Sequence, residues 1–129
     1  MKVNWLYVFN DKGTPIYSQE SYIEGSNNFK TAVLTHYIFG LQTIASQLQK
    51  NEFKKIEIAN EKFFLTKDDK IGFKYIIKIN RDSEYNDAEI LLKKIKDLFI
   101  ENFENKTEIP IEERIGLIST IKKELVNII

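Results

Sequence analysis

The chain has 129 residues, of which 43% are hydrophobic and 12% aromatic, enough to build a core and to predict a single domain over residues 1–129. Basic and acidic residues balance at 19 each, so the chain lacks the basic surplus with which a general nucleic-acid-binding protein neutralises phosphates, and we expect no nucleic-acid partner. The absence of cysteine excludes disulfides, thiol nucleophiles and thiolate metal sites, no run approaches the ~20 apolar residues of a membrane span, and we expect a cytoplasmic protein.

The N-terminal part of the chain predicts a β-hairpin. Val3 to Phe9 is largely apolar at both alternating sets of positions, which indicates a strand in the interior of a sheet. The turn signal Asn10-Asp11-Lys12-Gly13 follows. Pro15 to Ile23 alternates more mildly and indicates a second strand nearer an edge, where the missing N–H of Pro15 is tolerated.

A long helix is predicted from about Phe29 to Gln49. Thr31 to Gln49 contains no Lys, Arg, Asp or Glu, and a helix with an uncharged outer face is seldom surrounded by bulk water on that side. The residues expected to face the sheet recur at helical spacing: Phe29, Val33, Tyr37, Gly40, Leu41, Ile44 and Leu48. Leu34, Ile38 and Ala45 widen this stripe on one flank.

The opposite side of that helix is the first candidate interface with a partner protein. Its positions are mostly small and neutral: Ala32, Thr35, His36, Phe39, Gln42, Thr43 and Ser46. We select Ala32, Thr35, His36, Phe39, Thr43 and Ser46, because small residues allow another chain to approach closely and Phe39 would supply an aromatic anchor. The alternative is that a local loop covers Phe39, or that it is a tolerated exposed side chain.

Three short strands joined by short turns are predicted next, at Phe53–Ala59, Lys62–Thr66 and Phe73–Asn80. In the last of these strands, Phe73, Tyr75, Ile77 and Ile79 share one face and Ile76 lies on the other. The turn Lys67–Lys70 contains the acidic pair Asp68-Asp69. Because lysines flank this pair, we interpret it as a solvated turn and not as a metal site.

Two helices complete the chain. The first is predicted from about Asp87 to Glu104, with one apolar face formed by Ala88, Leu91, Leu92, Ile95, Leu98, Phe99 and Phe103. Pro110 suits the first turn of the second. The expected packing face of that last helix consists of Ile111, Ile115, Ile118, Leu125 and Ile129.

The predicted order β-β-α-β-β-β-α-α, over essentially the whole chain, resembles the longin domain and places this α+β chain near the longin and roadblock families. The resemblance implies a five-stranded antiparallel sheet with the first helix on one face and the last two on the other. It also implies that the strand after the first helix lies at a sheet edge, which makes Phe53, Lys55, Glu57 and Ala59 a second candidate interface. Lys54 and Lys55 are alternatively gatekeepers that discourage strand pairing at that edge.

Longin and roadblock proteins are non-enzymatic, form homo- or heterodimers, bind small GTPases and act as scaffolds in membrane traffic. The resemblance therefore implies a stand-alone interaction module that pairs with itself or with another longin or roadblock protein, with a small Ras-like GTPase as a further partner. Such a protein would be peripheral to membranes through its partners. This expectation rests on analogy of fold and not on a diagnostic motif.

The sequence offers little for catalysis. His36 is the only histidine, no Ser lies in a nucleophile elbow, and the five scattered glycines form no phosphate-binding loop. We therefore expect no enzymatic activity, no cofactor and no metal. Two alternatives stay open, namely a PAS-like small-ligand sensor with a pocket between sheet and helix, and an enzyme of a kind that its sequence does not reveal.

Overall fold

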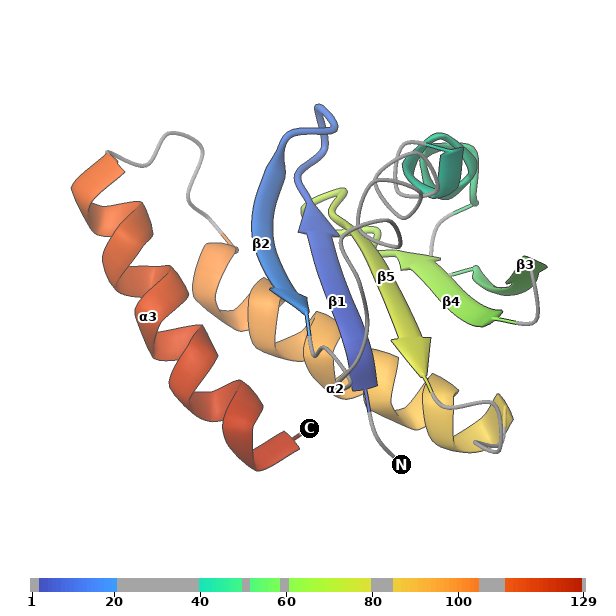
Figure 1. Ribbon diagram of the computed structural model, residues 1–129. Helices are drawn as coiled ribbons and strands as arrows, with labels where there is room; N and C mark the ends of the chain where they lie inside the picture. The colour runs from blue at the N-terminus through green and yellow to red at the C-terminus, as the bar shows by residue number, and fades with distance from the viewer. Residues whose placement is uncertain are drawn as a thin grey trace.

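The computed structural model describes residues 3–20, 40–49, 52–58, 61–79, 85–104 and 111–128. Its elements follow the order β-β-α-β-β-β-α-α (Figure 1), so the predicted order and the predicted α+β fold class are both confirmed. In chain order they are β1 (Val3–Phe9), β2 (Pro15–Glu20), a first helix at 40–46, β3 (Phe53–Ile58), β4 (Glu61–Lys67), β5 (Lys74–Ile79), α2 (Tyr85–Phe103) and α3 (Ile111–Ile128).

The five strands form one antiparallel sheet in the order β2-β1-β5-β4-β3. β1 and β5 are paired from Val3 with Ile79 to Phe9 with Lys74, so the N-terminal hairpin joins the later three strands along this ladder. β1 is apolar at both alternating sets of positions because it lies in the interior of the sheet. β2 alternates less strongly between apolar and polar residues because it lies at an edge. β3 forms the other edge.

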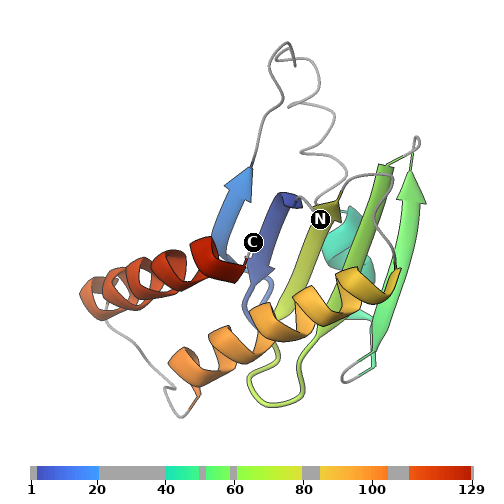
Figure 2. The ribbon, with the colours of Figure 1, turned by 90° about the horizontal axis from the view of Figure 1, so that it is seen from below.

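Helices lie on both faces of the sheet. Figure 2 shows α2 and α3 on one face and the first helix on the other. The buried side chains accordingly divide into two clusters, one of which joins the sheet to α2 and α3 while the other joins it to the first helix. In the second cluster Leu41, Ala45 and Leu48 pack with Trp5 and Phe63.

The alternation predicted for β5 is confirmed. Tyr75, Ile77 and Ile79 belong to the cluster under α2, whereas Ile76 belongs to the cluster under the first helix, and all four are fully buried. The seven residues predicted for the inner face of α2 are likewise its buried residues. A strongly periodic segment that crosses the middle of a sheet has one way to bury its apolar side chains, which explains this agreement.

The first helix ends earlier than expected. Its last helical residue is 46. After it, the hydrogen bonds join residues three apart, as in a 3₁₀ turn: Gln47 N donates to Ile44 O and Leu48 N donates to Ala45 O. Gly40, expected to face the sheet, is exposed, and a Cβ added there would meet no atom within 4 Å. The predicted positions from 29 to 39 lie outside the described residues.

The packing face predicted for α3 is partly wrong. Ile115 is 64% exposed, while Ile121, which was not selected, is fully buried together with Leu125. Ile118 packs on the same cluster only in part. Six residues separate Ile115 from Ile121, a rotation of roughly 240° at about 100° per residue, so burial of Ile121 and Leu125 against α2 and the sheet turns Ile115 outward.

The turn between β4 and β5 is built around Asp68, which is 1% exposed and not solvated as predicted. Its Oδ1 accepts bonds from the backbone N–H groups of Lys70, Ile71 and Gly72, at 2.7 to 3.0 Å. Its Oδ2 accepts from the N–H of Phe73 at 3.2 Å and from the hydroxyl of Tyr75 at 2.9 Å. Only the neighbouring Asp69 is exposed, so the acidic pair divides into an internal acceptor and a surface charge.

The β1–β2 turn lies against this second turn. Lys74 of β5 is 5% exposed, and its Nζ donates to the carbonyls of Asn10 and Asp11 at 3.3 and 3.0 Å. Gly72 adopts a φ of 73°, and a Cβ added to it would lie 3.1 Å from Cβ of Asp11. The two turns therefore support each other at one end of the sheet.

Candidate docking edge

The candidate interface on the first helix is described only at its C-terminal end. Ala32, Thr35, His36 and Phe39 lie outside the described residues, whereas Thr43 and Ser46 are exposed as expected of an outer face. The Ser46 hydroxyl donates to the carbonyl of Thr43 at 2.7 Å, and Lys67 Nζ lies 3.5 Å from the carbonyl of Ser46.

Gln42 does not lie on the open outer side to which helical spacing assigned it. It is half-buried, and its Nε2 would lie 2.8 Å from a Cβ added to Gly13 in the β1–β2 turn. This tertiary contact between helix and turn cannot be read from helical spacing. The outer face of the helix therefore keeps its role in partner binding as a prediction.

β3 gives the second candidate interface a defined geometry. It pairs with β4 without a bulge, from Phe53 opposite Thr66 to Ile58 opposite Glu61. β3 ends the order of the described strands, so among the described residues the backbone N–H and C=O groups on its outer side have no strand partner. Six residues of regular, unbulged edge form a template to which another extended chain can add.

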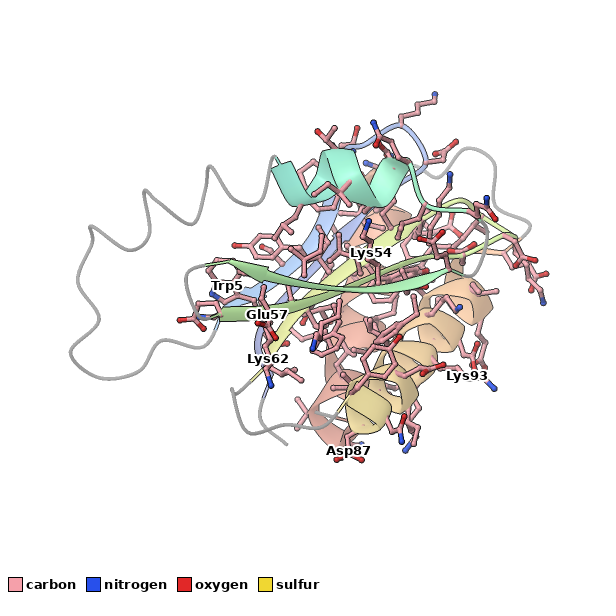
Figure 3. The ribbon with its side chains drawn as sticks, turned by 90° about the vertical axis from the view of Figure 1, so that its right-hand side faces the viewer. Trp5, Lys54, Glu57, Lys62, Asp87 and Lys93 are labelled. Carbon is pink, nitrogen blue, oxygen red and sulfur yellow. The ribbon has the colours of Figure 1, made fainter. Side chains whose placement is uncertain are left out.

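The side chains of β3 divide between the two faces of the sheet. Phe53 belongs with α2, because its ring stacks on Phe64 at 5.5 Å and meets Tyr85 edge-on at 5.0 Å between centroids. Alternation places Lys55 and Glu57 on this same face, while Ile56 packs with the cluster under the first helix. Figure 3 shows Lys54 and Glu57 on opposite sides of β3. Ala59 lies outside the described residues.

Lys55 and Glu57 form an ion pair along the strand. Lys55 Nζ lies 3.3 Å from Glu57 Oε1, and the two side chains are 42% and 54% exposed. Exposed pairs of this kind contribute about 0–1 kcal/mol. The pair is therefore free to exchange partners when another chain approaches.

A surface groove of about 570 Å³ lies between α2, the sheet edge at β3 and β4, and the β4–β5 turn. Phe53, Thr66, Leu92 and Ile100 provide its less exposed lining. Charged side chains form the remainder: Asp69, Lys70, Glu89, Lys93, Lys96, Asp97, Glu101 and Glu104.

The groove is open to solvent, as the exposure of its charged side chains shows. All of those side chains except Lys96 are exposed, and Lys70 and Glu104 approach each other across it at 4.0 Å. Lys93 lies on the outer surface of α2 in Figure 3. An open groove beside a strand edge suits a polypeptide better than a small ligand, which pockets usually enclose on most sides.

The described part of the chain offers no constellation for metal chemistry. Within the segments that the structure describes, no three His, Asp or Glu side chains gather as a potential metal site. His36 lies outside those segments. Among the described helices, none has the length and hydropathy needed to span a membrane.

Comparison of the sequence with protein-family models and with curated proteins finds no match. The geometry of the β3 edge is therefore the main evidence for function.

Proposed function

We propose that this protein is a non-enzymatic interaction module resembling longin domains, which acts as a dimerising scaffold or as a subunit that binds or regulates a small Ras-like GTPase. A role in membrane traffic, and a cytoplasmic location peripheral to membranes, follow from the same resemblance. The proposal includes docking of a partner chain on the edge strand β3.

The observation that carries this proposal is the regular edge that β3 forms at the end of the described sheet. Natural sheets usually protect such an edge with a bulge, a proline or a covering segment. β3 contains neither a proline nor a bulge against β4. Within the described residues of β3 itself, Lys54 and Lys55 are the protective feature, and Lys55 is already neutralised in part by Glu57.

The lining of the groove favours a protein partner over the small-ligand alternative. A sensor pocket would have to enclose its ligand between sheet and helix, with a few polar groups aimed inward. Here the lining charges are mostly exposed to solvent, and the apolar contribution is confined to residues such as Phe53 and Ile100.

Two measurements test the proposal. Light scattering coupled to size-exclusion chromatography measures self-association at about 100 µM, where a dimer with a micromolar Kd is largely formed. Titration against purified Ras-like GTPases, each loaded with GDP or with a GTP analogue, measures partner binding and its dependence on nucleotide. We expect self-association or nucleotide-dependent GTPase binding. A strict monomer that binds none of the GTPases contradicts the proposal.

A further inference from the structure

Resting on the proposed function, which it makes more specific, we propose that the groove beside α2 binds an extended, basic segment of a partner protein. The segment runs along the flank of α2 and not along β3. One apolar side chain of the segment enters the less exposed part of the groove. Two lysines or arginines, two and four residues further on, meet the carboxylates of Asp97 and Glu101.

The groove is elongated along α2. Its lining on this helix begins at Glu89 and ends just beyond the helix at Glu104, a distance of about 22 Å at a rise of 1.5 Å per residue. An extended chain of about seven residues covers this length. Figure 2 shows α2 crossing the strands obliquely. A chain that follows α2 therefore diverges from β3, and the groove is a binding surface separate from the strand edge.

The charges that line the groove change in character along its length. In the first half Glu89 is followed by Lys93 and Lys96, so that opposite charges compensate each other. From 97 to 104, by contrast, every charged residue is acidic. We call the carboxylates that line the groove there, together with one from the β4–β5 turn, the acidic end of the groove: Asp69, Asp97, Glu101 and Glu104.

Within the described residues the acidic end is poorly compensated. One ion pair reaches it, between Lys70 and Glu104 at 4.0 Å, and both side chains are exposed to solvent. Asp97 and Glu101 lie one helical turn apart, where like charges repel. The last turn of α2 has no basic residue to oppose the negative end of the helix dipole. This arrangement costs the helix stability, and a cationic ligand relieves it.

The apolar part of the groove is fixed before a ligand arrives. Leu92 is buried, while Phe53 and Ile100 are half-buried and present apolar surface to the groove. The ring of Phe53 is held between Phe64 and Tyr85, at 5.5 and 5.0 Å between centroids. A preformed surface lowers the cost of ordering side chains on binding, so this part suits an apolar side chain of the ligand.

Spacing along α2 sets the order of side chains in the bound segment. Leu92 and Asp97 lie about 7.5 Å apart along the helix axis, and Asp97 and Glu101 about 6 Å. In an extended chain, side chains on one face recur every two residues, about 6.7 Å. A segment with an apolar residue at its first position, and lysine or arginine at its third and fifth, therefore meets these three groups in turn.

Fluorescence anisotropy with synthetic peptides tests the proposal. The probe is a fluorescein-labelled nonapeptide of glycine and serine, with leucine at its third position and arginine at its fifth and seventh. We expect a Kd on the order of 100 µM in about 50 mM NaCl. Binding should weaken at least fivefold when glutamates replace both arginines, and also when NaCl is raised to about 500 mM. Replacing the leucine with serine should weaken it at least threefold.

Charge variants of the protein locate the binding site. Glu101→Lys should weaken binding of the arginine peptide at least tenfold without lowering Tm, because it places a cation near the C-terminal end of α2. Lys70→Gln releases the carboxylate of Glu104 and should tighten binding about twofold. Glu124→Lys is the matched control, because it makes the same change of charge at an exposed position of α3 outside the groove, and it should change Kd less than twofold.

The possible outcomes separate this inference from the proposed function. Equal binding of the arginine and glutamate peptides, a Kd above about 1 mM for the arginine peptide, or equal losses in Glu101→Lys and Glu124→Lys each overturn the assignment of the groove. If that happens while the protein self-associates or binds a GTPase, the proposed function stands and this inference falls. A monomer that binds neither the arginine peptide nor any GTPase contradicts both.

Discussion

Removing the Asp68 carboxylate tests whether the β4–β5 turn is held by one internal acceptor. Asp68→Ala leaves five donors without their partner, of which the Phe73 N–H and the Tyr75 hydroxyl make buried bonds. The three N–H groups on Oδ1 are partly buried, and water can reach them in the vacated space. Each of the two buried donors left without an acceptor costs about 1–2 kcal/mol, so we expect the free energy of unfolding to fall by about 3 kcal/mol.

Urea unfolding followed by tryptophan fluorescence measures this loss. Trp5 is the sole tryptophan of the chain and is 3% exposed, so its emission changes when the core opens. With a slope near 1.5 kcal/mol per molar urea, a loss of about 3 kcal/mol lowers the midpoint by about 2 M. A domain of this size has about 5–15 kcal/mol of stability in total, so the variant should remain folded without denaturant.

Asp69→Ala is the matched control, because it removes the same chemical group from the same turn at an exposed position. Its effect should stay within about 0.5 kcal/mol. Adding Tyr75→Phe to Asp68→Ala should recover about 1 kcal/mol, because it removes one stranded donor. If Asp68→Ala and Asp69→Ala lower the midpoint equally, the account of Asp68 as the organiser of the turn is refuted.

Two further predictions concern pH and glycine. Burial, and next the charge of Asp68, raise the pKa of Tyr75 far above its ordinary value. The unfolded chain therefore ionises this tyrosine above about pH 10 while the folded chain does not, and the free energy of unfolding should fall as pH rises beyond that point. Urea midpoints at about pH 8 and pH 11 should fall less for Tyr75→Phe than for the unaltered protein, and an equal fall would refute the assignment. Gly72→Ala should cost at least about 1 kcal/mol, because φ is 73° and Asp11 lies close, whereas Gly116→Ala in α3, with open space around it, should stabilise by about 0.5–1 kcal/mol. Thermal unfolding compares the two variants. A stabilised Gly72→Ala variant would contradict the first reason, and a destabilised Gly116→Ala variant would contradict the second.

The parts of the fold that the sequence predicted correctly are those where local pattern and burial coincide. β5 lies at the centre of the sheet with helices on both faces, so the alternation of Tyr75 and Ile76 had one possible outcome. α2 crosses the same region, and its inner face was predicted completely. α3 contacts its surroundings along a narrower stripe, so local periodicity alone did not distinguish Ile115 from Ile121.

The candidate site was predictable in position but not in its contacts. The resemblance to longin domains implied an edge strand at Phe53–Ala59, and β3 does lie at a sheet edge. The groove was not foreseen, because it needs Phe53 and the α2 flank to meet across more than thirty intervening positions. Asp68 was misread for a related reason, since its partners are mostly backbone N–H groups, which have no signature in a sequence.

The ladder between β1 and β5 has a consequence for how the chain folds. It joins the first described residues, beginning with Val3, to a strand that ends at Ile79. During synthesis on the ribosome, β1 therefore cannot form its hydrogen bonds to β5 until β5 has left the exit tunnel. Contacts of such sequence separation slow folding, and the waiting strand carries Trp5, Leu6 and Val8, all buried in the finished fold. The interval between the synthesis of β1 and that of β5 is thus a period in which the apolar side chains of β1 are available for misassociation with other chains.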